Sequence, residues 1–124
     1  MKNEELKKEK DIVERTYRFA LQIVRLVRSL PKEIVGYELG RQLLRSGTSI
    51  AANIEEAQGA FSKDDFIYKM QISFKEARET NLWLRLICDS EIIKDDKIKI
   101  LIKESIVLKN ILSSIVKSSK RKNS

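Results

Sequence analysis

Residues 43–59 read LLRSGTSIAANIEEAQG, and this stretch organises the rest of the chain. Small residues stand where a helix usually carries bulky ones: Ser46, Gly47, Ser49, Ala51 and Ala52. Polar residues follow apolar ones within a single turn, as Arg45 follows Leu44. Small side chains let a neighbouring backbone come close. The stretch therefore predicts the second half of a long helix that packs closely against its neighbours.

The composition favours a single all-α domain. The chain has 124 residues, enough for one hydrophobic core and too few for two. Apolar residues make up 42% and charged residues 35%, which is typical of a soluble globular protein with a high charge content. One proline and four glycines provide few turns, whereas a β-rich fold needs many. We therefore expect long helices.

Apolar residues recur at three- and four-residue steps over four segments of the chain. They predict helices over about 5–30, 32–58, 62–88 and 95–117. Pro31 ends the first helix and suits the first turn of the second. Short connections then give an antiparallel up-down-up-down four-helix bundle. The serine- and lysine-rich residues 118–124 are predicted to be a disordered basic tail.

Other residues predict how the helices begin and end. Ser62, followed three residues later by Asp65, resembles a capping box at the start of the third helix. Asp95 or Asp96 can cap the fourth helix. Gly59 is expected to end the second helix in a left-handed conformation.

Two features predict close packing and a second buried surface. Gly36 and Gly40 share one face of the second helix, and Gly47 lies further along it, which indicates a close helix crossing. The fourth helix has a wide apolar arc because Ile100 and Ile106 add to the core-facing residues. An arc wider than one core face needs suggests a subunit interface.

Positive charge is concentrated at the two ends of the chain. The net charge is +7, with eight basic against five acidic residues over 1–30 and nine against four over 91–124. Clustered basic residues are typical of proteins that bind nucleic acid through salt-sensitive, weakly specific phosphate contacts. The candidate contacts are Arg15, Arg18, Arg25, Arg28, Lys99, Lys103, Lys117, Lys120, Arg121 and Lys122.

Two other interpretations of the polar residues stay open. The charge can serve solubility alone, in which case the chain is an assembly or scaffold module whose ligand is another protein. A carboxylate-dependent enzyme is a third and weaker hypothesis, because Glu76 and Glu79 adjoin on one helix face. For these carboxylates we favour solvation, or a polar layer with arginines such as Arg45 that fixes the helix register.

The residue types present argue against several classes of function. The chain has no histidine, which removes the commonest general base and transition-metal ligand, so no catalytic residue, metal or cofactor is expected. Its one cysteine, Cys88, excludes an intramolecular disulfide and fits a reducing cytoplasm. Residues 1–15 lack the apolar region of a signal peptide, and no apolar run is long enough to span a membrane.

Two motifs resemble a known family, the 23S ribosomal RNA intervening-sequence proteins. The pattern of that family on the second helix is found here in Arg45, Ser49, Ile50, Asn53, Ile54 and Glu56. The family's usual glycine after the glutamate is Ala57 here, with Gly59 two residues later. On the third helix the nearest matches are Ser73, Glu76 and Glu79. The resemblance extends over about residues 12–117.

The resemblance implies an antiparallel four-helix bundle that assembles into a homopentamer, in a family whose molecular function is not established. A related branch, the accessory protein of diversity-generating retroelements, is a basic pentameric barrel that binds nucleic acid and a reverse transcriptase. That kinship favours an RNA or DNA ligand, with RNA preferred. The expected structural polar network comprises Arg45, Asn53, Glu56, Glu76 and Glu79.

Overall fold

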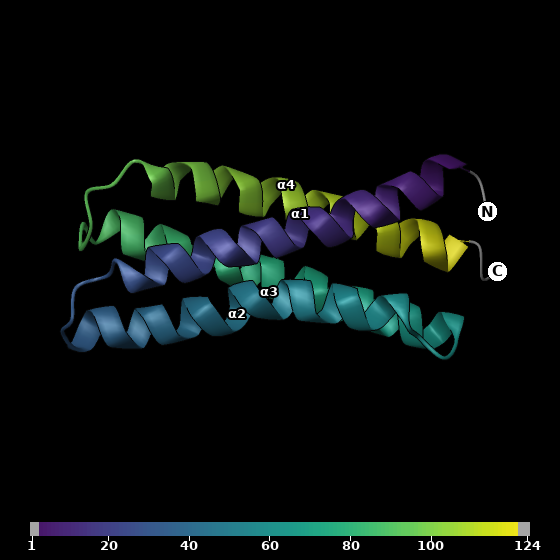
Figure 1. The fold of residues 1–124 in the computed structure, drawn as a ribbon, viewed down its shortest axis with the longest axis horizontal. Helices are drawn as coiled ribbons and strands as arrows, with labels where there is room; N and C mark the ends of the chain where they lie inside the picture. Colours follow the sequence, from purple (N-terminus) through teal and green to yellow (C-terminus); the bar gives the residue numbers. More distant parts are fainter. Residues whose placement is uncertain (1–2, 122–124) are drawn as a thin grey trace.

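Four long helices form an antiparallel bundle in the computed structural model, which describes the backbone of residues 3–121 and the side chains of residues 11–121. The helices are α1 (Asn3–Arg28), α2 (Ile34–Gln58), α3 (Lys63–Asp89) and α4 (Lys97–Arg121). Figure 1 shows the α1–α2 and α3–α4 connections at one end, with the α2–α3 connection and both termini at the other. The predicted all-α, up-down-up-down bundle is confirmed.

Each helix packs against two others. The backbone of α3 lies close to that of α2 and α4, and α1 lies close to α2. The contact between α1 and α4 is the sparsest of the four, and within residues 3–121 no diagonal pair of helices is in backbone contact. Among the described residues, the α1–α4 side is therefore the least closely packed side of the bundle.

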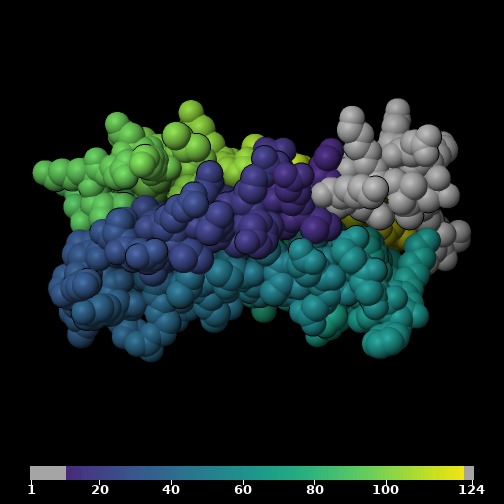
Figure 2. Space-filling model, in the orientation of Figure 1, coloured from purple at the N-terminus to yellow at the C-terminus, as the bar shows by residue number. Residues whose placement is uncertain are grey.

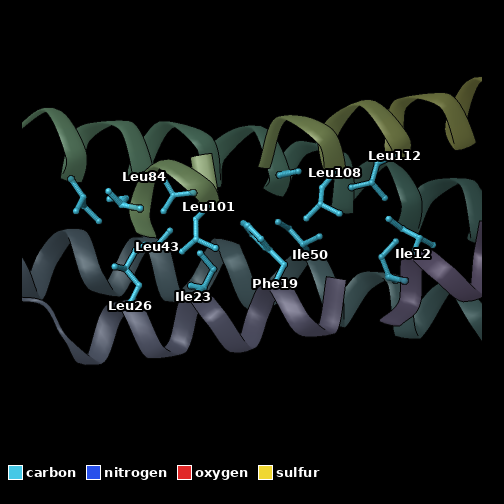
Figure 3. Close-up of a cluster of buried hydrophobic side chains, with 14 of the residues drawn as sticks. Ile12, Phe19, Ile23, Leu26, Leu43, Ile50, Leu84, Leu101, Leu108 and Leu112 are labelled. Carbon is cyan, nitrogen blue, oxygen red and sulfur yellow. The ribbon is translucent and has the colours of Figure 1, made fainter. Parts of the chain in front are cut away.

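The core is a continuous column of aliphatic and aromatic side chains along the bundle axis (Figure 3). Phe19 and Ile23 of α1 meet Ile50 of α2 and Leu101 of α4 there. All four are buried, as the helical periodicity predicts. Burying a side chain of this size stabilises the fold by about 1.5–3 kcal/mol, so this column is the main reason the helices form.

The α1–α2 connection is longer than predicted. Helix α1 ends at Arg28, and the next two N–H groups bond to the carbonyls of Leu26 and Val27. Helix α2 begins at Ile34 rather than in the turn after Pro31, because the Glu33 carboxylate accepts the Gly36 N–H at 2.8 Å and caps the helix.

The glycines of α2 do allow a close helix crossing. A Cβ at Gly47 would lie 2.9 Å from Cγ2 of Ile23 on α1, and a Cβ at Gly40 would lie 3.1 Å from Cδ1 of Leu30. Gly36 has a different role, since a Cβ there would lie 2.0 Å from the Pro31 carbonyl oxygen. It permits the tight connection rather than the crossing.

At the other helix ends, the predicted N-cap at Ser62 is confirmed and the predicted C-cap conformation at Gly59 is wrong. The Ser62 hydroxyl accepts the Asp65 N–H at 3.0 Å, so the N-cap of α3 is confirmed. The Asp95 carboxylate accepts the Lys97 N–H at 2.9 Å at the start of α4. The left-handed cap at Gly59 is wrong, because its φ is −105°. The left-handed residue is instead Glu91, in the α3–α4 connection, with φ 59°.

The predicted disordered tail is wrong for residues 118–121, which continue α4 to Arg121. Serine and lysine are tolerated in a helix once it is anchored, and Ile115 and Val116 pack against the core just before this segment. Cations such as Lys120 in the last turn also interact favourably with the helix dipole. The remaining part of the predicted tail, including Lys122, lies outside the described residues.

Candidate nucleic-acid interface

A groove runs between α1 and α4, which are the neighbouring helices with the sparsest backbone contact. It consists of three adjoining hollows of about 380, 500 and 430 Å³. The first two share Gln22 and Ile100, and the second and third share Arg15, so the hollows form one continuous surface. Figure 2 shows this side of the molecule, with α1 in purple in front and α4 in green to yellow above it. We call this surface the α1–α4 groove.

Among the described residues of the α1–α4 groove, basic side chains outnumber acidic ones. Its cations are Arg15, Arg18, Arg25, Lys97 and Lys103. Its acids are Asp11, Asp95 and Glu104. Arg18 and Arg25 are seven residues apart, about two helical turns, so both project along the same face of α1. The groove therefore has an excess of basic side chains, which are spread along its length.

One pair of charges bridges the two helices where the second and third hollows adjoin. Arg15 of α1 donates from Nε to Oε2 of Glu104 at 2.7 Å and from Nη2 to Oε1 at 2.8 Å. This two-bond geometry is the strongest that an arginine and a carboxylate form. The hydrogen bonds from the Glu104 carboxylate raise the pKa of Arg15 above its usual range. Arg15 thus ties α1 to α4, and its charge is largely neutralised.

The other predicted cations of the groove keep their charge exposed. Arg18 lies 3.9 Å from Glu14, but both side chains are mostly in solvent, so this pair is weak. Arg25 and Lys103 form no ion pair within the described side chains. The same holds for Lys97, which the sequence analysis did not select.

The remaining predicted contacts lie elsewhere on the surface. Arg28 lines a different hollow, at the junction of α1 and α2. Lys99 lies 3.6 Å from Asp96 in an exposed pair. Lys117 and Lys120 are exposed on the last turns of α4, which also carry Arg121. The fold therefore gathers Arg15, Arg18, Arg25 and Lys103 into the α1–α4 groove and separates the others from it.

A polar cluster lies on the opposite side of the bundle, between α2 and α3. Arg45 donates from Nη1 to Oε2 of Glu76 at 3.0 Å and from Nη2 to Oε1 of Glu79. The Trp83 indole donates to the same Glu79 oxygen at 3.2 Å. The Arg45 guanidinium, with help from the indole, holds the pKa of Glu79 below its usual range.

The other two residues expected in that network act separately. Asn53 donates its amide to the Ser49 carbonyl oxygen at 2.9 Å, within α2. Glu56 pairs with Lys69 of α3 at 3.4 Å, in solvent. The ion pairs of Arg45 and of Glu56 thus link α2 to α3 at two places, and the pair of Arg45 with Glu76 is the more buried. Across the side chains of residues 11–121, no group of three potential metal ligands occurs.

Comparison with known proteins identifies the family. Residues 8–114 match the family described as 23S rRNA-intervening sequence protein. The chain belongs to this family. It also resembles the crystal structure of a protein with unknown function from the S23 ribosomal protein family of Bacteroides thetaiotaomicron, with a TM-score of 0.80 and 39% identity. That match covers 89% of this chain and 98% of the other. No curated protein matches the chain.

The residues that carry the family resemblance gather at the α2–α3 contact. Arg45 meets Glu76 and Glu79 there, and the Ser73 hydroxyl donates to the Ile50 carbonyl oxygen at 2.9 Å. In this intervening-sequence protein the motif therefore joins two helices and does not line the α1–α4 groove.

Several polar contacts inside the bundle were not predicted from the sequence. Thr80 and Ser46 are joined by a 2.9 Å hydrogen bond between their hydroxyl oxygens, and Asn81 donates to Ser105 of α4 at 2.9 Å. The sequence signal that could have predicted these contacts is a small hydroxyl residue, such as Ser46 or Thr80, at a helix position where the apolar period predicts an aliphatic residue. Glu104 carried no comparable sign, because its partner Arg15 is 89 residues away.

No helix in the described part of the chain is both long and apolar enough to cross a membrane.

Proposed function

We propose that this protein is a non-enzymatic RNA-binding bundle that holds phosphates along the α1–α4 groove and works as an oligomer. The observation that carries the proposal is the alignment of Arg18, Arg25, Lys97 and Lys103 along one open surface. None of these four is held in a close, buried ion pair within the described side chains. Arginine and lysine side chains that remain exposed in a line suit the repeating charge of a nucleic-acid backbone.

The family name favours RNA as the nucleic acid, because it refers to sequences that intervene in 23S ribosomal RNA. The groove offers side-chain charges and no recognition helix suited to a DNA major groove. Contacts of this kind fix the position of a backbone but do not read its bases. We therefore expect binding that depends on RNA shape and charge more than on sequence.

Salt provides the first test. If the four cations each contact one phosphate, the logarithm of the binding constant falls against the logarithm of salt concentration with a slope of roughly −3 to −4. Fluorescence anisotropy with a labelled RNA hairpin measures this slope. A flat salt dependence, or no binding at low salt, would contradict the proposal.

A matched pair of variants locates the contacts. The groove variant combines Arg18→Gln, Arg25→Gln and Lys103→Gln, all of them exposed residues of the groove. The control variant combines Lys63→Gln, Lys75→Gln and Lys94→Gln, which removes the same charge from exposed positions outside it. We expect the groove variant alone to lose binding and to show a shallower salt slope. Equal losses in the two variants would assign the effect to net charge.

An assembly module that binds protein rather than RNA is the second candidate, and exposed apolar residues on α4 favour it. Ile106 is exposed, and so are Ile100 and Val107, which also line the α1–α4 groove, so an interface that covered all three would compete with RNA for that groove. Such residues are commonly covered in an oligomer. We propose self-association, with five copies as the family resemblance implies. Native mass spectrometry measures this, and a monomer would contradict the oligomer.

A further inference from the structure

A further hollow, separate from the α1–α4 groove, lies where α1 ends and α2 begins. It has a volume of about 900 Å³, with walls from the end of α1, the connection and the first turns of α2. Figures 1 and 2 show this connection, in blue, at the end of the bundle away from the termini. Gly36 and Gly40 line it without contributing side chains, so its character is set by their neighbours. We call it the α1–α2 hollow.

An exposed aromatic ring and three cations line the α1–α2 hollow. Tyr37 is 58% exposed. Arg41 is one helical turn further along α2, and Arg28 and Lys32 come from the end of α1 and the connection. Ile34 and Leu44, both exposed, add aliphatic surface beside the ring.

Acidic groups near the α1–α2 hollow do not cancel this charge. Glu38 is the one carboxylate in its wall, and it lies 3.4 Å from Arg41 in a solvent-exposed pair. Such a pair is weak and readily exchanged for another anion. The nearby Glu33 carboxylate is already bound to the Gly36 N–H as the cap of α2.

A second exposed tyrosine, on α1 rather than α2, has acidic instead of basic neighbours. Tyr17 lines a smaller hollow together with Glu14 and Glu55, and no cation is among the described residues that line it. An anionic ligand would be repelled there. The combination of an exposed ring with several cations therefore distinguishes the surroundings of Tyr37 from those of Tyr17.

We propose that the α1–α2 hollow binds an unpaired base of single-stranded RNA. The base stacks on the Tyr37 ring, and the three cations of the hollow hold the adjoining phosphates. Aromatic stacking combined with backbone charge is how proteins bind single-stranded nucleic acid, and a base inside a duplex has no free face to offer. The inference rests on the proposed function in that the ligand is RNA, but it uses residues outside the α1–α4 groove.

The test compares two RNA probes of equal phosphate number, a labelled single-stranded oligoadenylate and a labelled blunt duplex. Three variants are measured with each: Tyr37→Ala, Tyr37→Phe and Tyr68→Ala. Tyr68 is the matched control because it is 59% exposed on α3. We expect Tyr37→Ala to weaken single-strand binding by about five- to 150-fold, as the loss of one stacked base does. Tyr37→Phe keeps the ring and should bind normally, and duplex binding should be unchanged in all three.

Several outcomes would overturn the proposal. Equal effects of Tyr37→Ala and Tyr68→Ala would remove the stacking role, as would an equal loss for duplex and single strand. Binding of the duplex alone by the unaltered protein would overturn the hollow but leave the α1–α4 groove standing. Binding of neither probe would overturn both. If Tyr37→Ala lowers the solution mass and leaves single-strand binding unchanged, the hollow is instead a contact between copies. Ultraviolet cross-linking of the oligoadenylate to Tyr37 would support the proposal directly.

Discussion

Thr80 of α3 and Ser46 of α2 join their helices by a hydrogen bond of 2.9 Å between hydroxyl oxygens that are completely buried. Thr80 Oγ1 also lies 2.8 Å from the Glu76 carbonyl oxygen, whereas the other partner of Ser46 Oγ, the Leu43 carbonyl oxygen, is 3.4 Å away. Ser46 therefore depends on Thr80 for its good hydrogen bond. A buried hydroxyl without one is destabilising.

Replacing Thr80 by valine should consequently destabilise the fold. Valine has nearly the same shape but leaves the Ser46 hydroxyl with a long bond only, at a cost of about 1–3 kcal/mol. Adding Ser46→Ala to Thr80→Val should recover part of the loss, because no buried hydroxyl is then left over. Urea unfolding followed by circular dichroism measures both. A double variant with fully additive losses would contradict the pairing.

Replacing Gly47 by alanine should also destabilise the bundle. The new methyl group would lie within 3.0 Å of two atoms of Ile23, which is a buried and β-branched side chain that cannot turn away. Overpacking outweighs the gain in helix propensity, and we expect a net loss of about 1–2 kcal/mol. Gly40→Ala is the control, because its new methyl group would lie 3.1 Å from the tip of Leu30 and 3.4 Å from Cγ1 of Val27, which are longer contacts, and it should cost less. Unfolding curves of the two variants compare them.

The pairing of Glu79 with Arg45 should make stability depend on acid. The pKa of Glu79 is lowered in the folded protein. Its contribution to folding stability is therefore fully present above the pKa of a glutamate in the unfolded chain, roughly 4.3. The contribution is lost as pH falls through the lower folded value. Arg45 is half exposed, so the effect should be about 1 kcal/mol or less. Glu79→Gln should flatten this part of a stability-against-pH curve below pH about 5, whereas Glu55→Gln, at an exposed control position, should not.

Replacing Glu104 by glutamine should separate stability from RNA binding. The change weakens the two-bond contact with Arg15, so the free energy of unfolding should fall by about 0.5–1.5 kcal/mol. It also removes an acid from the α1–α4 groove and releases the Arg15 charge, so RNA should bind up to about fivefold more tightly at low salt. Glu55→Gln removes the same charge elsewhere on the surface. Tighter binding in both variants would point to net charge alone.

Much of the fold could be predicted from sequence because helix formation depends on local spacing. The apolar period marked the four helices, and Ser62 with Asp65 marked the start of α3 through a bond between near neighbours. The end of α4 was mispredicted because its stability comes from anchoring by Ile115 and Val116, whereas composition reflects only average propensity. The cap at Gly59 failed for a similar reason, since glycine permits a left-handed conformation without requiring it.

Only part of the candidate site could be predicted from the sequence. Charge counts selected Arg18, Arg25 and Lys103 but gave equal weight to Lys99, which lies outside the groove. The pairing of Arg15 with Glu104 was invisible, because it joins residues far apart in the chain.

The sequence by itself determined the helices, the bundle and the family, because these follow from the period of apolar residues and from short motifs. Only the tertiary structure decided which charges act together. Cations on α1 and α4 line one groove because those two helices are neighbours yet contact each other least. The tertiary structure also decided that the small and polar residues of 43–59 divide between the contact of α2 with α1 and the contact of α2 with α3. Gly47 faces α1 and Arg45 faces α3, since successive residues of a helix point in different directions.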